Sequence, residues 1–322
     1  MSALRVLEAI TPSRIGGAEV YVADLCRELP ALGAEIELFC PAGRPFVEYA
    51  KSRGLDAITW NTHGKLDPVT VLKLAGLIKR DRIDVIHTHL STASLLGALA
   101  GKLAGIPSVA HVHGLNSAAC FRRSNLVIAV SEAVKRHLCA QGLPEDRVRV
   151  AHNGVDLDKY SPMPIDDAKR EQGFDPDSPV FGVFGRLSSE KGQRNAIEAF
   201  ALLLKDVPTA SLILTGDGKD RPTLEALVRS LGIETRVRFA GFVPDIRGMI
   251  AACDAVIVPS LKEGFGLVAV NAMAMERPVV GTMIGGLPEI IVDGETGFLV
   301  PPNDPESIAR SLMLLVQDKR LA

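Results

Sequence analysis

Short apolar runs alternate with amphipathic stretches along both halves of the chain. In the first half the apolar runs predict strands at residues 4–10, 35–40, 84–87, 108–113 and 126–130. Apolar residues at helical spacing predict helices at residues 18–29, 68–80, 91–104 and 132–141. Strands separated by helices of about 10–15 residues indicate βαβ units, and therefore a parallel sheet with helices on both faces.

The same alternation restarts in the second half. It predicts strands at residues 180–183, 210–215, 237–240, 255–258 and 278–281, with a short last strand around Leu299. The predicted helices are residues 193–205, 222–230, 267–275 and 306–317. Between the halves, residues 157–178 are polar and proline-rich without an apolar run, which is typical of a linker. We therefore predict an α/β protein of two Rossmann-like, doubly wound parallel-sheet domains, residues 1–156 and 179–322, with a cleft between them.

The composition is that of a soluble protein and excludes several classes. Of 322 residues, 47% are hydrophobic and 23% charged, which is enough for two cores. A formal net charge of -2 gives no general signal for nucleic-acid binding. The five cysteines include no C-x-x-C pair, which favours reduced thiols. The chain begins with a strand pattern rather than a signal peptide, and its apolar stretches are too short to span a bilayer, so we expect a cytoplasmic protein.

Glycine turns at predicted strand ends are the first candidates for chemistry. Gly16 and Gly17 lie between the first strand and the first helix, where a backbone N–H can approach a phosphate or a sugar. A glycine pair is also common in an ordinary tight turn, so this motif alone leaves both interpretations open. Gly216 marks a similar turn after the strand at 210–215.

Two cations follow the strand at 180–183. After Gly185 come Arg186 and, five residues later, Lys191. A guanidinium fork and an ammonium at the carboxyl end of a strand are suited to hold a diphosphate. The alternative is two solvated cations in a surface loop.

The stretch PSLKEGFGLV at residues 259–268 carries the most specific signal. Glu263 is placed to accept hydrogen bonds from sugar hydroxyls, and the helix expected near Leu267 offers free N–H groups to an anion. The alternative is that Glu263 caps this helix while the glycines only allow close packing.

At this point the chain resembles a known family, the retaining nucleotide-sugar glycosyltransferases of family 4, which have the GT-B fold. The order and spacing of many short motifs carry the resemblance over nearly the whole chain. They are GGAE at 16–19, DVIHTH at 84–89, HVHG at 111–114, AVSE at 129–132, NGVD at 153–156, GRLSSEKG at 185–192, GDG at 216–218, GFV at 241–243, PSLKEGFGLV at 259–268, GGLPE at 285–289 and GETGFLV at 294–300.

The resemblance implies a role for each matching position. Arg186 and Lys191 would hold the donor diphosphate and neutralise the leaving group, Glu263 would bind the donor sugar, and His113 would lie near sugar and acceptor; these four are the implied catalytic residues. The implied donor-binding set adds Gly16, Gly17, Gly185, Gly216, Gly241, Phe242, Val243, Phe265, Gly266, Leu267 and Asn271. The charge that develops on the leaving group is then stabilised without a metal, and no cofactor is expected.

Two departures from the family pattern bear on activity. Asn271 stands where the family has a second glutamate, which usually binds the ribose hydroxyls. An amide loses the charge-assisted hydrogen bonds of a carboxylate, so we expect weaker donor binding. The sequence also ends soon after the helix at 306–317, before a further helix that the family usually carries, which would loosen domain closure.

Four histidines in the first half admit a second kind of site. His87 and His89, like His111 and His113, lie two residues apart on neighbouring strands, so each pair faces one way. Imidazoles are common zinc ligands. No acidic or cysteine ligand accompanies them in the sequence, so we expect no metal site. We expect His87, His89 and His111 to be hydrogen-bonded instead, and only His113 to have a functional role.

The basic pairs Arg122–Arg123 and Lys135–Arg136 allow peripheral contact of the first domain with an anionic membrane at the inner face. The alternative is an ordinary solvated face.

The sequence thus predicts a retaining, metal-independent hexosyltransferase for polysaccharide or glycolipid synthesis. It would use a UDP- or GDP-linked sugar and a glycan, glycolipid or small-molecule acceptor. A non-catalytic or weakened nucleotide-sugar binder is the alternative that Asn271 motivates, and another enzyme on a similar fold, such as an epimerase, is a third.

Overall fold

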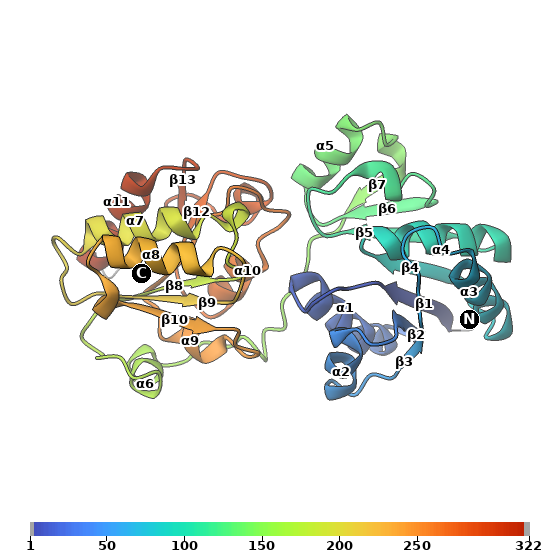
Figure 1. The fold of residues 1–322 in the computed structure, drawn as a ribbon, viewed down its shortest axis with the longest axis horizontal. Helices are drawn as coiled ribbons and strands as arrows, with labels where there is room; N and C mark the ends of the chain where they lie inside the picture. Colours follow the sequence, from blue (N-terminus) through green and yellow to red (C-terminus); the bar gives the residue numbers. More distant parts are fainter. Residues whose placement is uncertain (1–2, 319–322) are drawn as a thin grey trace. The chain divides into compact units, whose positions relative to one another are not determined.

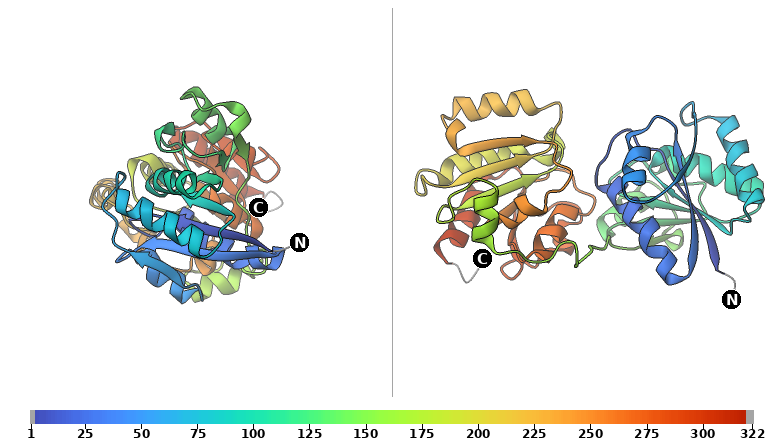
Figure 2. Two further views of the ribbon diagram at one scale, coloured as in Figure 1. Left: turned by 90° about the vertical axis from the view of Figure 1, so that its right-hand side faces the viewer. Right: turned by 90° about the horizontal axis from the view of Figure 1, so that it is seen from below.

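The computed structural model describes residues 3–318 and divides into two compact units, Met1–Asn153 and Gly154–Ala322. Each unit is built around one fully parallel sheet with helices on both faces, as Figures 1 and 2 show. The predicted fold class of two doubly wound, Rossmann-like domains is therefore confirmed. None of the helices within residues 3–318 is long and apolar enough to cross a membrane.

The first unit has a seven-stranded sheet with the order β3-β2-β1-β4-β5-β6-β7. Its strands are β1 (Leu4–Ile10), β2 (Ala34–Pro41), β3 (Ala57–Trp60), β4 (Val85–His89), β5 (Ser108–Val112), β6 (Leu126–Ala129) and β7 (Val148–Val150). Its helices are α1 (Gly17–Glu28), α2 (Pro45–Ser52), α3 (Pro68–Arg80), α4 (Ser91–Ala104) and α5 (Glu132–Ala140), with 3-10 turns η1 (Leu29–Leu32), η2 (Ala118–Cys120) and η3 (Glu145–Arg147).

Burial on both faces explains why β1 is nearly all apolar. Leu7 and Ala9 pack against α3 and α4, whereas Ile10 points to the opposite face and packs against α1 and α2. A central strand of a parallel sheet meets helices on both sides, so it needs apolar residues at successive positions rather than at alternate ones. Glu8 is the exception, a fully buried carboxylate on the α1 face of this strand.

The second unit has a six-stranded sheet with the order β10-β9-β8-β11-β12-β13. Its strands are β8 (Val180–Phe184), β9 (Ser211–Thr215), β10 (Val237–Gly241), β11 (Ala255–Val258), β12 (Val279–Thr282) and β13 (Gly297–Val300). Its helices are α6 (Ile165–Glu171), α7 (Gln193–Leu203), α8 (Arg221–Ser230), α9 (Arg247–Ala251), α10 (Leu267–Ala274) and α11 (Pro305–Gln317), with 3-10 turns η4 (Ser189–Lys191), η5 (Glu234–Arg236) and η6 (Leu287–Glu289).

Two apolar layers sandwich the second sheet. Phe181 and Val183 of β8 face a layer that includes α7, α8 and α11, whereas Val180 and Phe184 face the layer that includes α9 and α10. Alternate side chains of one strand therefore belong to different cores, as the pleat of a strand requires.

The structure contains elements that the hydrophobic pattern did not predict, namely α2, β3, β7, α6 and α9. The helix α6 lies inside the segment predicted as a linker. The sequence IDDAKRE has too few apolar residues to show a helical pattern, and only Ala168 and the side chain of Lys169 are buried. The hydrophobic pattern therefore did not predict this helix. The Lys169 ammonium lies 2.9 Å from Asp254, which precedes β11, so a buried ion pair rather than an apolar stripe holds α6 to the sheet.

Gly192, which begins α7, packs directly on the loop that follows β11. It has φ of +65°, and a Cβ at this position would lie 1.9 Å from the carbonyl oxygen of Pro259. Backbone contact of this kind leaves room for no side chain, so the packing of α7 against the β11 loop requires glycine.

We predict that Gly192→Ala destabilises the second unit more than Gly232→Ala does. Gly232 has a similar φ of +68° and nothing within 4 Å of its virtual Cβ, so its substitution isolates the backbone cost of about 1–2 kcal/mol. The steric overlap at Gly192 should at least double this loss of unfolding free energy, measured by urea denaturation. Equal losses for the two variants would contradict the packing argument.

Candidate functional site

The strand order of the second sheet creates a switch point between β8 and β11. The two strands are neighbours, but the chain continues from β8 to β9 and β10 on one side. It then returns to β11 on the other side of β8 and continues outward to β12 and β13. The helix after β8 is α7, in one apolar layer, and the helix after β11 is α10, in the other. Loops that leave the carboxyl ends of such strands diverge to opposite faces, and ligands bind there in open α/β sheets.

An ion pair joins the two loops at this switch point. Lys191 from the loop after β8 places its ammonium 2.7 Å from Oε2 of Glu263, in the loop after β11. The side chains are 31% and 12% exposed, respectively. Ser260 Oγ donates to the same carboxylate oxygen over 3.0 Å. The structure thus brings together two of the predicted catalytic residues that are 72 positions apart in the sequence.

Backbone contacts fix the relative position of these loops. The carbonyl oxygen of Glu190 accepts hydrogen bonds from the N–H groups of Leu261 and Lys262, over 2.8 and 3.0 Å. Thr282 at the end of β12 donates its hydroxyl to the Ser260 carbonyl over 2.6 Å. Residues at or after the ends of three neighbouring strands, β8, β11 and β12, therefore hold the loop that carries Glu263 in place.

Glu263 does not cap α10. The N-cap of this helix is Gly266, with φ of +114° and no side-chain cap hydrogen bond, while Glu263 Oε1 accepts from the adjacent N–H of Gly264. The capping alternative is thus wrong, and the carboxylate faces Lys191 instead.

Close backbone packing behind Glu263 explains the glycine pair of GGLPE. A Cβ on Gly285 would lie 1.8 Å from the carbonyl oxygen of Glu263, and one on Gly286 would lie 2.7 Å from that of Gly264. The turn after β12 therefore supports the EGFG stretch from behind, and Phe265 is buried beneath it.

Arg186 lies on the same loop as Lys191 but in a more solvated place. Its side chain is 38% exposed, and its guanidinium contacts Glu190 Oε2 over 2.9 Å. The buried Gln193 donates to the Arg186 carbonyl over 2.7 Å and so holds the loop against the start of α7. Because Glu190 is exposed, its ion pair with Arg186 is weak, and the guanidinium can turn toward a bound anion.

The remaining predicted donor-binding residues of this unit surround the same edge. The N–H of Gly216 donates to the carbonyl of Gly241 over 2.7 Å, and that of Gly185 donates to the Thr215 carbonyl over 2.9 Å, so the turns after β8, β9 and β10 adjoin one another. Phe242 is 60% exposed, an unusual state for a phenyl ring, and Val243 is half-buried. Asn271 lies on α10 one turn after Leu267 and is half-buried.

In the first unit, Gly16 and Gly17 form the predicted turn between β1 and α1. Gly16 is the N-cap of α1, and no side chain caps this helix. The carboxylate of Glu19 lies close by, since a Cβ on Gly16 would be 3.3 Å from its Oε2. Burial raises the pKa of Glu19, while hydrogen bonds from the backbone at Gly16 and Glu19 oppose this rise.

The histidines gather around a buried carboxylate that the sequence analysis missed. Glu8 of β1 contacts His87 Nδ1 over 2.9 Å and His89 Nε2 over 2.7 Å, and His89 Nδ1 lies 3.0 Å from His113 Nε2. Hydrogen bonding of His87 and His89 agrees with the expectation. His111 differs, because neither of its buried ring nitrogens has a partner. The carboxylate inside the otherwise apolar segment from Val6 to Ile10 was the available signal for Glu8.

The basic pairs are partly engaged inside the first unit. Arg122 donates to the Gln141 carbonyl over 2.5 Å, and Lys135 lies 3.2 Å from Glu145. Arg123 and Arg136 are exposed. Membrane contact through this surface stays a prediction.

Comparison with known proteins agrees with the division of the chain into two units. Residues 15–159 match the family model for Glycosyltransferase Family 4, and residues 164–322 match that for Glycosyl transferases group 1. The chain is 28% identical to an N-acetyl-alpha-D-glucosaminyl L-malate synthase of Bacillus anthracis, over 95% of this chain and 86% of that protein. It is 31% identical to a D-inositol 3-phosphate glycosyltransferase of Corynebacterium diphtheriae, over 94% and 82% of the respective chains.

Among solved structures, the chain resembles Anabaena Alr3699/HepE in complex with UDP-glucose. The TM-score is 0.87 at 28% identity, and the match covers 99% of this chain and 91% of the other. Two Rossmann-like units, an ordered series of motifs and full-length similarity therefore agree: the chain belongs to glycosyltransferase family 4 and is a sugar-transferring enzyme with the GT-B fold.

Proposed function

We propose that this protein transfers a hexose, with retention of configuration and without a metal, from UDP-hexose to a hydroxyl group of its acceptor. The observation that carries the proposal is the Lys191–Glu263 pair at the β8–β11 switch point, which joins a cation for phosphate to a carboxylate for sugar hydroxyls. The similarity to HepE, which was solved with UDP-glucose, supports UDP over GDP as the base of the donor.

The Lys191–Glu263 ion pair can be replaced by contacts of each side chain with the donor. The Lys191 side chain is 31% exposed, so a diphosphate can reach its ammonium and compete with Glu263 for it. In this proposal Lys191 and Arg186 turn to the diphosphate. Glu263 is then free to accept hydrogen bonds from the sugar hydroxyls, while the Phe265–Leu267 backbone faces the sugar and phosphates.

The reaction breaks the bond between the sugar C1 and the β-phosphate oxygen and forms a bond from C1 to the acceptor oxygen. The acceptor proton passes to a phosphate oxygen of the departing UDP. Negative charge grows on that diphosphate as the bond breaks, and fixed positive charge from Lys191 and Arg186 stabilises it most in the transition state. Front-side departure and attack on one face of the sugar give retention.

The assignments of the other predicted residues are part of the same proposal. Gly185, Gly216 and Gly241–Val243 would surround the nucleotide, and Asn271 would contact its ribose. Gly16, Gly17 and His113 would act from the first unit, on phosphates and acceptor respectively. The acceptor class stays open between a glycan, a glycolipid and a small molecule, as does peripheral membrane contact.

A weakened or non-catalytic nucleotide-sugar binder is the second candidate, favoured by Asn271. It shares the donor site with the enzyme and differs only in turnover. Binding and turnover are therefore measured separately below.

We predict that UDP and UDP-hexose stabilise the protein selectively in thermal unfolding without added metal. A ligand at about 100 times its dissociation constant contributes about 2.7 kcal/mol, which is readily visible as a rise in melting temperature. GDP and ADP at equal concentrations serve as controls. A shift with GDP alone would overturn the assignment of the base, and no shift with any nucleotide would contradict the donor site.

We predict that Lys191→Met lowers kcat/KM for sugar transfer by about 100- to 1,000-fold, the usual effect of removing one charge-stabilising donor. Glu263→Gln, which keeps the size of the side chain, should also lower it, through weaker sugar binding. Lys205→Met, two residues after the end of α7, removes an exposed charge and is the matched control. Wild-type protein that binds UDP-hexose but releases no UDP with any acceptor of a broad panel would favour the non-catalytic binder.

We predict that Asn271→Glu tightens UDP binding by about 10-fold, because a carboxylate forms charge-assisted hydrogen bonds to the ribose hydroxyls that are stronger than those of an amide. Asn271→Gln has the length of glutamate without its charge and should not reproduce the gain. Isothermal titration calorimetry with UDP measures both variants. Equal affinities for the two would show that charge at this position is irrelevant to the ribose.

A further inference from the structure

Three histidines and a glutamate converge on one face of the first sheet. Glu8 of β1 is in register with His87 of β4, and His89 of β4 is in register with His111 of β5. Because the strands are parallel and neighbouring, these four side chains, here called the β1–β4–β5 cluster, point to the same side. Tyr21 of α1 packs on this side against His111, with ring centroids 5.0 Å apart.

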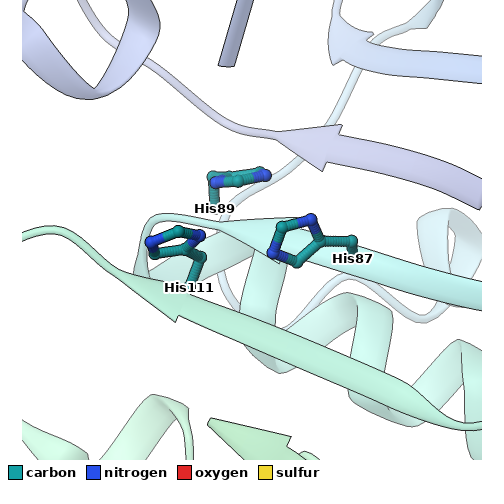
Figure 3. Close-up of side chains that lie close together, drawn as sticks. All are labelled: His87, His89 and His111. Atoms are coloured by element: carbon teal, nitrogen blue, oxygen red, sulfur yellow. The ribbon is translucent and has the colours of Figure 1, made fainter. Parts of the chain in front are cut away.

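The histidine ring nitrogens lie close together and several have no hydrogen-bond partner. Each of His87, His89 and His111 offers a ring nitrogen within 4.8 Å of those of the other two. Figure 3 shows His87 and His111 with a ring nitrogen of each turned toward the space between them, and His89 beside that space. His87 Nε2 and both nitrogens of His111 are buried without a partner, and His111 is only 1% exposed. Buried polar atoms rarely lack a partner, so these atoms point to a ligand.

Glu8 determines which ring nitrogen carries the proton in His87 and in His89. Its carboxylate accepts from His87 Nδ1 and His89 Nε2, so in each ring the proton lies on the nitrogen that faces Glu8 and the other nitrogen carries a lone pair. The lone pair of His87 Nε2 has no partner, whereas His89 Nδ1 lies 3.0 Å from His113 Nε2, a contact that a bound ion would replace. A carboxylate behind an imidazole is the usual arrangement at metal sites, where it orients the ring and makes it more basic.

We propose that His87, His89 and His111 bind a divalent transition-metal ion of the zinc class, with Glu8 as the residue that positions His87 and His89. Ligand nitrogens 2.0–2.1 Å from a tetrahedral zinc lie about 3.4 Å from one another, so small rotations of the rings bring them into place. The expectation of no metal site assumed that no acidic residue accompanies the histidines, and the structure places Glu8 among them.

The ion has a structural role in this proposal. It ties β4 to β5, and through Glu8 to β1, at the carboxyl edge of the first sheet. This edge already carries backbone strain, since Leu90, directly after His89, has φ of +69°. The ion takes no part in the bond changes of the proposed sugar transfer, although His113, proposed to act on the acceptor, contacts the ligand His89 over 3.0 Å.

The test uses the full chain, stripped with EDTA and free of nucleotide. We expect one Zn²⁺ per chain by elemental analysis after dialysis and a melting temperature that rises with Zn²⁺. Co²⁺ in place of Zn²⁺ should give visible ligand-field bands without a thiolate charge-transfer band, which excludes the five cysteines as ligands. Because no donor is present, the outcome is independent of the nucleotide experiments.

Variants identify the ligands. His111→Gln should weaken Zn²⁺ binding by more than about 100-fold, and Glu8→Gln by about 10- to 100-fold, as for residues that orient ligands. His87→Gln provides a second ligand variant at a partly exposed ring, and far-UV circular dichroism checks that each variant folds. His63→Gln, at an exposed histidine outside the cluster, is the control and should bind as the wild type does.

Two results would overturn the proposal. One is a wild-type chain that takes up no stoichiometric Zn²⁺ or Co²⁺. The other is folded His111→Gln and His87→Gln variants that bind the ion as tightly as the His63→Gln control.

Discussion

The parallel pairing of β8 with β11 is the constraint on which the donor side of this enzyme depends. Parallel neighbouring strands end at the same edge of the sheet. Here the chain continues from β8 to β9 on one side of the pair and from β11 to β12 on the other. Their loops must therefore meet at that edge while their helices cover opposite faces. Lys191 and Glu263 become neighbours for this reason, although neither lies in the other's local sequence.

Charges within the two units are held in different ways, and this difference has functional consequences. The Lys191 side chain is 31% exposed, so a substrate can compete with Glu263 for its ammonium. Glu8 is fully buried, and its charge is sustained only by the imidazoles beside it. Removing one partner from a buried group of this kind is costly, which makes the β1–β4–β5 cluster a fixed part of the fold rather than an exchangeable contact.

The hydrophobic pattern predicted most elements because the central strands are buried on both faces. The predicted boundaries agree with β1, α3, α4 and β11 to the residue. It failed where burial is slight or polar. β3 has no fully buried residue, and α6 is held by the ion pair of Lys169 with Asp254 rather than by an apolar stripe. Contacts made with residues far along the chain leave no periodic signal, so such elements could not be read from a single sequence.

By itself the sequence determined the fold class, the family and the residue types gathered at the donor edge, because strand periodicity and glycine-rich turns are local properties of the chain. The tertiary structure alone decided which charges face one another. It paired Glu263 with Lys191 instead of with the start of α10, and it brought Glu8 to histidines 79 and 81 residues away. The pairing and register of neighbouring parallel strands determine which distant residues come into contact. Register is a property of the folded sheet and cannot be read from any single stretch of sequence.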